Sequence, residues 1–331
     1  MGSLMRSINW SETVFGPVES WPQSLRTAIS VMLSSSFAMV VAWGPEFRFF
    51  YNDRYRPVIG AKHPAALGTP ARVIFPEAWH FIGPLFERTR QGEAVALDDV
   101  LIPLERHGYL ENCYFILSYS PIRDESGEVG GMLAVVAETT ERVQSERRMK
   151  TLRDLARQAS DTSTLHVAFA GAAQILAENP IDVPFALFYK VDPDGRRARL
   201  AQVTGLGGSG NALPEIIDLE NTDLENSAEN QWPLAESFRT GRLTVVEDLS
   251  SRFGLLPGGP YPEPTNTAVI APLSRPGQSH PDGAVVFGVS PRRALDDQYR
   301  GFYELAADHI LTGIRNAVAR QEERERLAGR H

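Results

Sequence analysis

Apolar and polar positions along residues 1–140 follow two different periods, and the order of those periods outlines one domain. Leu25, Ile29 and Met32 recur at helical spacing, which predicts a helix with one apolar face. Strand-like stretches flank the turn at Gly44-Pro45, a helix-like segment follows, and three strand-like stretches come after it (94–106, 109–122 and 129–138). The predicted order is therefore a helix, two strands, helical segments and three strands.

A second series of the same periods follows. Apolar residues recur at helical spacing from Leu165 to Leu176, and an Asp194-Gly195 turn joins two strand-like stretches. A short helix, three more strands and a Pro/Gly-rich loop over residues 250–267 come next, and a long helix begins at about Leu295. The pattern predicts a second domain of strands and helices.

A charged helix is expected directly after the last strand of the first series. Glu141 falls in its first turn, where the helix dipole favours negative charge, and Thr139 or Thr140 is placed to cap it. Five residues lie 4, 3, 4 and 3 positions apart along this helix: Ser145, Met149, Leu152, Ala156 and Ala159. Such a seam favours pairing with a second copy of the chain. A connector helix that packs on its own chain is the alternative, because two heptads are short for a coiled coil.

The composition is that of an ordinary globular protein, with 43% hydrophobic and 22% charged residues over 331 positions. A net charge of −8 argues against nucleic acid binding. No apolar run approaches the roughly 20 residues of a membrane span, so we expect a cytoplasmic protein without membrane insertion. The single cysteine, Cys113, excludes an internal disulfide, and the seven histidines lack the spacing of metal ligands.

Several motifs resemble the N-terminal PAS region of bacterial sensor histidine kinases. They are GPVESWPQSLRTAI, WGPEF, YNDRYRPVIGAKHPAALG, SYSPIRDESGEVGG and ETTER, and they cover most of residues 9–143. Three later motifs resemble the GAF module that follows PAS in those kinases: NPIDVPFALFY, WPLAESFRTG and GVSPRRALDDQYRGFYELAA. The resemblance implies an α+β protein with two tandem sensory modules, each an antiparallel sheet with flanking helices, joined by a long signalling helix. The implied segments are a PAS domain with an N-terminal capping helix (9–140), a connector or coiled-coil helix (141–160), a GAF domain (161–318) and the start of a C-terminal signalling helix (319–331).

The same resemblance implies a function. The chain would be the sensory input region of a two-component histidine kinase, which senses a small molecule or another signal and passes it through a homodimer to a downstream kinase module. The phosphoacceptor and ATP-binding motifs of those kinases are missing from the sequence, so we expect no enzymatic activity in this chain. The alternatives are a relay scaffold without a ligand, or the input region of a cyclase or phosphatase. A GAF-type small-molecule reductase is disfavoured, because it would need at least two cysteines and the sequence has one.

Apolar residues of the expected strands and helices are the candidates for lining a ligand pocket. They are Met39, Tyr55, Trp79, Phe81, Cys113 and Phe115 in the PAS domain, and Phe185, Phe188, Trp232, Val285 and Phe287 in the GAF domain. The segment Glu138, Thr139 and Thr140 resembles the Asp-x-Thr junction that couples the last PAS strand to a signalling helix, with Glu in place of Asp.

No cofactor is expected. Some PAS domains hold haem through a helical histidine, and His80 is the corresponding candidate, with Met39 and Ile116 as apolar walls. Helical spacing puts His80 off the apolar stripe, which favours a surface or structural role. The reactive cysteine of flavin-binding PAS domains lies in a motif that is missing around Cys113, so we expect a buried, unreactive thiol there.

Overall fold

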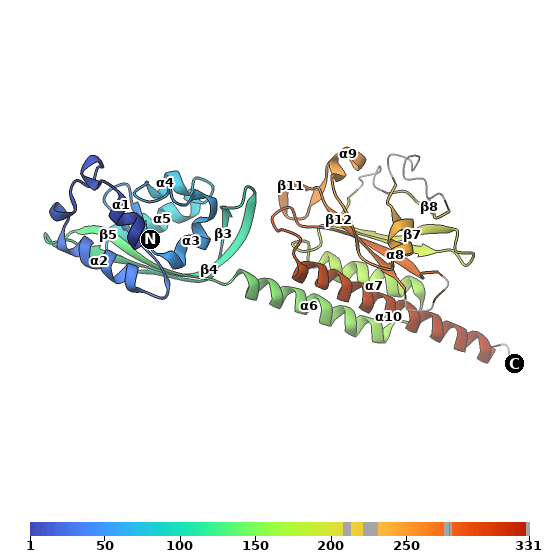
Figure 1. Cartoon of the computed structure of the whole chain (residues 1–331). Coiled ribbons are helices and arrows are strands. Elements are labelled where there is room, and N and C mark those ends of the chain that lie inside the picture. Colours follow the sequence, from blue (N-terminus) through green and yellow to red (C-terminus); the bar gives the residue numbers. More distant parts are fainter. Residues whose placement is uncertain (208–212, 221–230, 275–277, 279, 329–331) are drawn as a thin grey trace. The chain divides into compact units, whose positions relative to one another are not determined.

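The structure, a computed structural model, describes residues 1–207, 213–220, 231–274, 278 and 280–328. It divides into two compact units, residues 1–144 and residues 145–331, each built around one main antiparallel sheet with helices against it (Figure 1). The predicted α+β class is confirmed. The division falls inside the helix expected over residues 141–160, so most of that helix belongs to the second unit.

The first unit contains a five-stranded antiparallel sheet in the order β2-β1-β5-β4-β3. Its strands are β1 (Ala38–Trp43), β2 (Arg48–Tyr51), β3 (Val95–Glu105), β4 (Leu110–Arg123) and β5 (Val129–Glu138). Its α-helices are α1 (Gly2–Ser7), α2 (Gln23–Ser34), α3 (Arg56–Ile59), α4 (Ala71–Ile74) and α5 (Trp79–Arg90). All five strands lie close to their predicted positions, because period-two alternation and turn residues are local signals.

Alternate residues of β1 point into two separate cores. Val40 and Ala42 belong to a core shared with α3, α4 and α5, whereas Met39 and Val41 belong to a core shared with α1 and α2. The N-terminal segment contributes Trp10 to the latter core. The first 34 residues therefore cover the outer face of the sheet over β1 and β2, and the other helices cover its inner face.

The second unit contains a six-stranded antiparallel sheet in the order β8-β7-β6-β13-β12-β9, and a separate pair, β10-β11. The strands are β6 (Ala186–Val191), β7 (Arg197–Thr204), β8 (Ile216–Asp218), β9 (Thr244–Val246), β10 (Leu256–Gly258), β11 (Tyr261–Thr265), β12 (Ala268–Leu273) and β13 (Gly283–Gly288). The helices are α6 (Thr140–Asp161), whose first turn lies in the first unit, α7 (Leu165–Ala177), α8 (Leu234–Thr240), α9 (Leu249–Phe253) and α10 (Asp297–Ala328).

Helices α7 and α10 pack on one face of this sheet (Figure 1). The region expected as a loop over residues 250–267 instead contains most of α9 and the β10-β11 pair, in which Leu256 and Thr265 are opposite each other and buried. The C-terminal helix, α10, extends beyond residue 319 to Ala328, and residues 329–331 lie outside the described residues.

Candidate functional site

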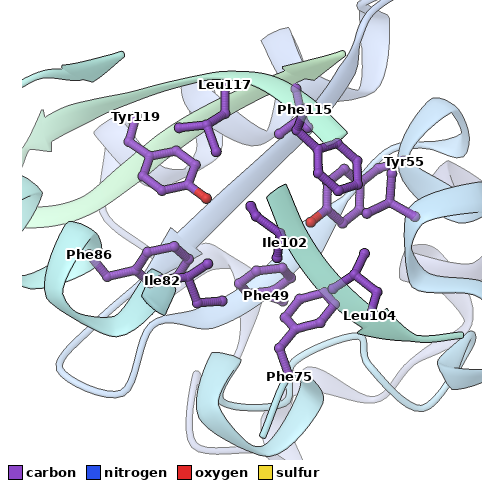
Figure 2. A pocket seen from close by; sticks show the side chains of 12 residues that line it. Phe49, Tyr55, Phe75, Ile82, Phe86, Ile102, Leu104, Phe115, Leu117 and Tyr119 are labelled. Carbon is purple, nitrogen blue, oxygen red and sulfur yellow. The ribbon is translucent and has the colours of Figure 1, made fainter. Parts of the chain in front are cut away.

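A small cavity lies on the inner face of the first sheet, between the sheet and the helical segments (Figure 2). Its volume is about 30 Å³. The lining side chains are apolar or aromatic and come from β2, β3, β4, β5, α3, α5 and the turns between them: Phe49, Tyr55, Val58, Phe75, Ile82, Phe86, Ile102, Leu104, Phe115, Leu117, Tyr119 and Val136. Strand β4 supplies three of these residues in a row of alternate positions, because every second residue of a strand points to the same face.

The structure brings together only part of the predicted lining of this cavity, as far as the described residues go. Tyr55 and Phe115 line it, and Cys113 is fully buried in the same core without lining the cavity. Trp79 and Phe81 are half-buried against that core. The prediction for Met39 was wrong, because this residue points to the opposite face of the sheet and packs in the outer core.

Two residues of the haem alternative lie outside the cavity. His80 is exposed on α5, while Ile82 and Phe86 of the same helix line the cavity. Ile116 is 41% exposed on the outer face of β4, between the lining residues Phe115 and Leu117. His80 therefore does not reach the cavity, and Ile116 is not one of its walls.

The hydroxyl oxygens of Tyr55 and Tyr119 point into the cavity (Figure 2). Burial raises the pKa of both tyrosines, and the nearby Tyr119 raises the pKa of Tyr55 further. Both hydroxyls are therefore protonated at neutral pH. Sequence reasoning missed Tyr119, although its position two residues after Leu117 in an alternating strand places it on the same face.

The junction between β5 and α6 is held by a side-chain network. Arg106 donates from both terminal nitrogens to the two carboxylate oxygens of Glu138, each at 2.8 Å. The Thr140 hydroxyl donates to Glu138 at 2.8 Å and accepts from the backbone N–H of Tyr114 at 3.0 Å. The backbone N–H of Thr139 donates to the Tyr114 carbonyl at 2.8 Å. The start of α6 is thereby attached to β4, one residue from the cavity wall at Phe115.

A second contact holds the same junction from β3. Asp99 accepts hydrogen bonds from the Thr139 hydroxyl, at 2.7 Å, and from Arg142. The hydrogen bond from Arg142, which has the larger effect, and the one from Thr139 keep the pKa of Asp99 below its usual value. The predicted junction residues Glu138, Thr139 and Thr140 thus lie together, and sequence reasoning missed their partners Arg106 and Asp99, which are distant in the chain.

The predicted GAF pocket residues lie on opposite faces of the second sheet, so they do not form one pocket. Phe185 and Trp232 belong to one core, where Trp232 stacks on Phe253 with ring centroids 4.3 Å apart. The other three residues belong to the core beneath α7 and α10: Phe188, Val285 and Phe287. The prediction of a single pocket was therefore wrong, because residues an odd number of positions apart in a strand point to opposite faces.

The predicted dimer seam is divided by the packing of α6 on its own chain. Ala159 is 2% exposed in the core of the second unit, where it lies against Gly313 of α10, and Leu152 packs against the same core. Ala156 is half-buried, whereas Ser145 and Met149 are exposed, Met149 by 59%. Ala159 is therefore not available to a partner.

The face of α6 that packs on its own unit carries a buried charge. Asp182 is 2% exposed and accepts hydrogen bonds from Arg147 at 2.6 Å, from Arg148 at 3.1 Å and from Asn179 at 3.1 Å. The guanidinium of Arg148 also lies 4.0 Å from the ring centroid of Tyr299 in α10. These contacts fix α6 to the base of the second unit.

Within the described ranges, no helix is long and apolar enough to cross a membrane, and no group of three His, Cys, Asp or Glu side chains is arranged to hold a metal ion.

Three solved structures are similar to this chain over part of its length. The GAF domain of a phosphoenolpyruvate-protein phosphotransferase from Acinetobacter is 17% identical, with 52% of this chain and 94% of that chain covered and a TM-score of 0.38. The phytochrome photosensory core module of Stigmatella aurantiaca is 13% identical, with 88% and 59% covered and a TM-score of 0.40. A free methionine-R-sulfoxide reductase from Neisseria meningitidis is 15% identical, with 52% and 90% covered and a TM-score of 0.37.

No curated protein matches the chain. A family model described as the PAS fold matches residues 33–144. This stretch includes all five strands of the first sheet, the helical segments on its inner face and the cavity between them. Residues 33–144 are a PAS domain.

Proposed function

We propose that the chain is a sensory input region, in which the PAS domain receives a signal in its cavity and α6 carries the response into the second unit. The observation that carries this proposal is the attachment of α6 to the cavity wall. Tyr114 holds Thr139 and Thr140 through its backbone, and its neighbour Phe115 lines the cavity. A shift of β4 caused by a ligand would therefore reach the first turn of α6 directly.

The second unit is proposed to be a GAF-type module. Its six-stranded antiparallel sheet, with α7 and α10 against one face, fits the motifs that resemble GAF in residues 179–189, 232–241 and 288–307. These motifs and the PAS domain before them also support the finer proposal of an input region of a bacterial two-component histidine kinase. The downstream kinase module and the homodimer belong to that proposal.

A reductase is not the proposed function. The only cysteine of the sequence is Cys113, which lies in the PAS domain, so the second unit has no thiol for a reaction that needs two. A relay scaffold without a ligand is the second candidate, and the small volume of the cavity favours it, since about 30 Å³ has room for only about two or three water molecules.

Native mass spectrometry of freshly purified protein separates the two candidates, together with a thermal-shift panel of metabolites. The sensory proposal predicts a copurifying small molecule, or a metabolite that raises the melting temperature of the first unit. That shift should be lost in a Leu117→Phe variant, which fills the cavity. Protein without a bound mass, and without a shift across the panel, would favour the scaffold.

A further inference from the structure

The two tyrosine hydroxyls in the PAS cavity belong to buried side chains. Tyr55 is 7% exposed and Tyr119 is 6% exposed. In the part of the chain that the structure describes, neither hydroxyl has a hydrogen-bond partner, and both point into the cavity (Figure 2). Buried hydroxyl groups nearly always have such a partner, so this pair indicates a site for an acceptor atom.

The rest of the lining defines the chemistry around that acceptor. None of the other lining residues is polar; Phe49, Ile82 and Leu117 are typical of them. An ion bound there would lose its hydration without gaining an opposite charge, which disfavours anions and cations alike. The volume of about 30 Å³ admits a few non-hydrogen atoms at most.

We propose that the PAS cavity binds a small uncharged molecule whose single polar atom accepts hydrogen bonds from Tyr55 and Tyr119, while its apolar atoms contact the surrounding side chains. This inference rests on the proposed sensory function and names the class of ligand for the same site. The proposed class excludes ligands that are purely hydrocarbon, because they have no acceptor atom, and it excludes charged metabolites.

A pair of probes with one shape tests the role of the hydroxyls. Acetonitrile and propyne are linear molecules of nearly equal length, but only acetonitrile ends in a nitrogen that accepts a hydrogen bond. Ligands of this size bind at best with dissociation constants on the order of 1 mM, so each probe is titrated to about 100 mM. Changes in the ring resonances of the tyrosines in NMR spectra report binding in wild type, Tyr55→Phe, Tyr119→Phe and Tyr51→Phe.

Each of the substitutions Tyr55→Phe and Tyr119→Phe should weaken acetonitrile binding about fivefold, the value of one neutral hydrogen bond, and leave propyne binding unchanged. Propyne binding also reports whether the cavity is intact in each variant. Tyr51→Phe is the matched control, because the Tyr51 hydroxyl bonds to His63 at 2.9 Å and Tyr51 does not line the cavity. It should leave both affinities unchanged.

The proposal is overturned if acetonitrile does not bind the wild type, or if the phenylalanine substitutions change the affinities for both probes equally. Such a failure concerns the chemistry of the ligand alone. The proposed sensory function fails separately, if a change in the cavity leaves the start of α6 unaffected, and that measurement needs neither probe.

Discussion

Arg106 binds both carboxylate oxygens of Glu138 at 2.8 Å, and so the turn between β3 and β4 is joined to the last residue of β5, two positions before α6 begins. The Arg106 side chain is 9% exposed, and it also donates to Glu111 at 3.3 Å. A bidentate pair of this kind has a defined geometry as well as a favourable energy. The position of Glu138, and of the helix that follows it, therefore depends on Arg106.

Replacing Arg106 with alanine should lower the free energy of unfolding of the first unit by about 3 kcal/mol, because the buried carboxylate of Glu111 and the partly exposed carboxylate of Glu138 both lose this partner. Urea titration followed by hydrogen-exchange mass spectrometry reads the two units separately. Arg88→Ala removes an exposed ion pair with Glu93 and is the matched control, with little change expected. Equal effects of the two substitutions would contradict the role given to Arg106.

The Asp182 cluster makes the corresponding prediction for the second unit. Asp182→Asn should lower its free energy of unfolding by about 3–5 kcal/mol, because the buried Arg148 loses its counter-charge. Hydrogen exchange of residues 145–161 should rise in the same variant. Asp154→Asn, which removes a surface pair with Lys150, should change the free energy by less than about 0.5 kcal/mol. An unchanged exchange rate of α6 in Asp182→Asn would show that the cluster does not hold the helix.

The alternation of the sequence was enough to predict the five PAS strands, but not the exact start of α2. Serine is a favoured N-cap residue, yet the hydroxyl of Ser20 donates to the Pro17 carbonyl at 2.7 Å and closes a separate 3-10 turn, and the helix begins at Gln23. Local propensity allows a helix that begins after Ser20 as well as a separate turn followed by the helix. The second arrangement is observed, and in it Trp21 packs in the outer core.

The buried face of α6 could not be found from hydrophobicity. Arg148 counts as an exposed residue in any apolar pattern, but here it is 6% exposed because its charge meets Asp182 and its guanidinium meets the ring of Tyr299. The face of α6 that is buried therefore differs from the predicted seam: Arg148 is buried, whereas Met149 is exposed. Asp182 lies 34 positions from its partner Arg148, and Arg106 lies 32 positions from its partner Glu138. Only the fold brings each pair together.

Stability should fall at alkaline pH because of the buried tyrosines. Burial raises the pKa of Tyr51 to about 12, and the pKa values of Tyr55 and Tyr119 are raised further. An unfolded tyrosine loses its proton near pH 10. Above about pH 10 the folded state therefore holds more protons than the unfolded state, so this contribution is complete below pH 10 and is lost as the pH rises towards the folded pKa values.

Each strongly shifted tyrosine should contribute a loss of about 1.4 kcal/mol per pH unit above about pH 10. Urea unfolding at about pH 9 and about pH 11 measures the total loss. In Tyr55→Phe the loss between these values should be smaller by about 1.4 kcal/mol. The same slope in wild type and variant would contradict the assignment.

A homodimer that pairs through the seam proposed on α6 has only the exposed part of that helix available. Met149→Glu places a charge at a 59% exposed position and should convert the dimer into a monomer without affecting the fold of the chain. Analytical ultracentrifugation measures the change, and Arg153→Glu, at another exposed position of the same helix, is the matched control. A wild-type protein that is monomeric at about 100 μM, a concentration far above the Kd of a stable dimer, would contradict the homodimer.

The central claim is that the PAS cavity and the first turn of α6 are mechanically coupled through β4. Leu117→Ala enlarges the cavity, whereas Met32→Ala opens a comparable space in the outer core of the same unit, and each costs about 2–5 kcal/mol. Hydrogen exchange of the amides of residues 140–144 compares them. We predict that Leu117→Ala accelerates this exchange at least about tenfold more than Met32→Ala does; equal acceleration by both, or none by Leu117→Ala, would contradict the coupling.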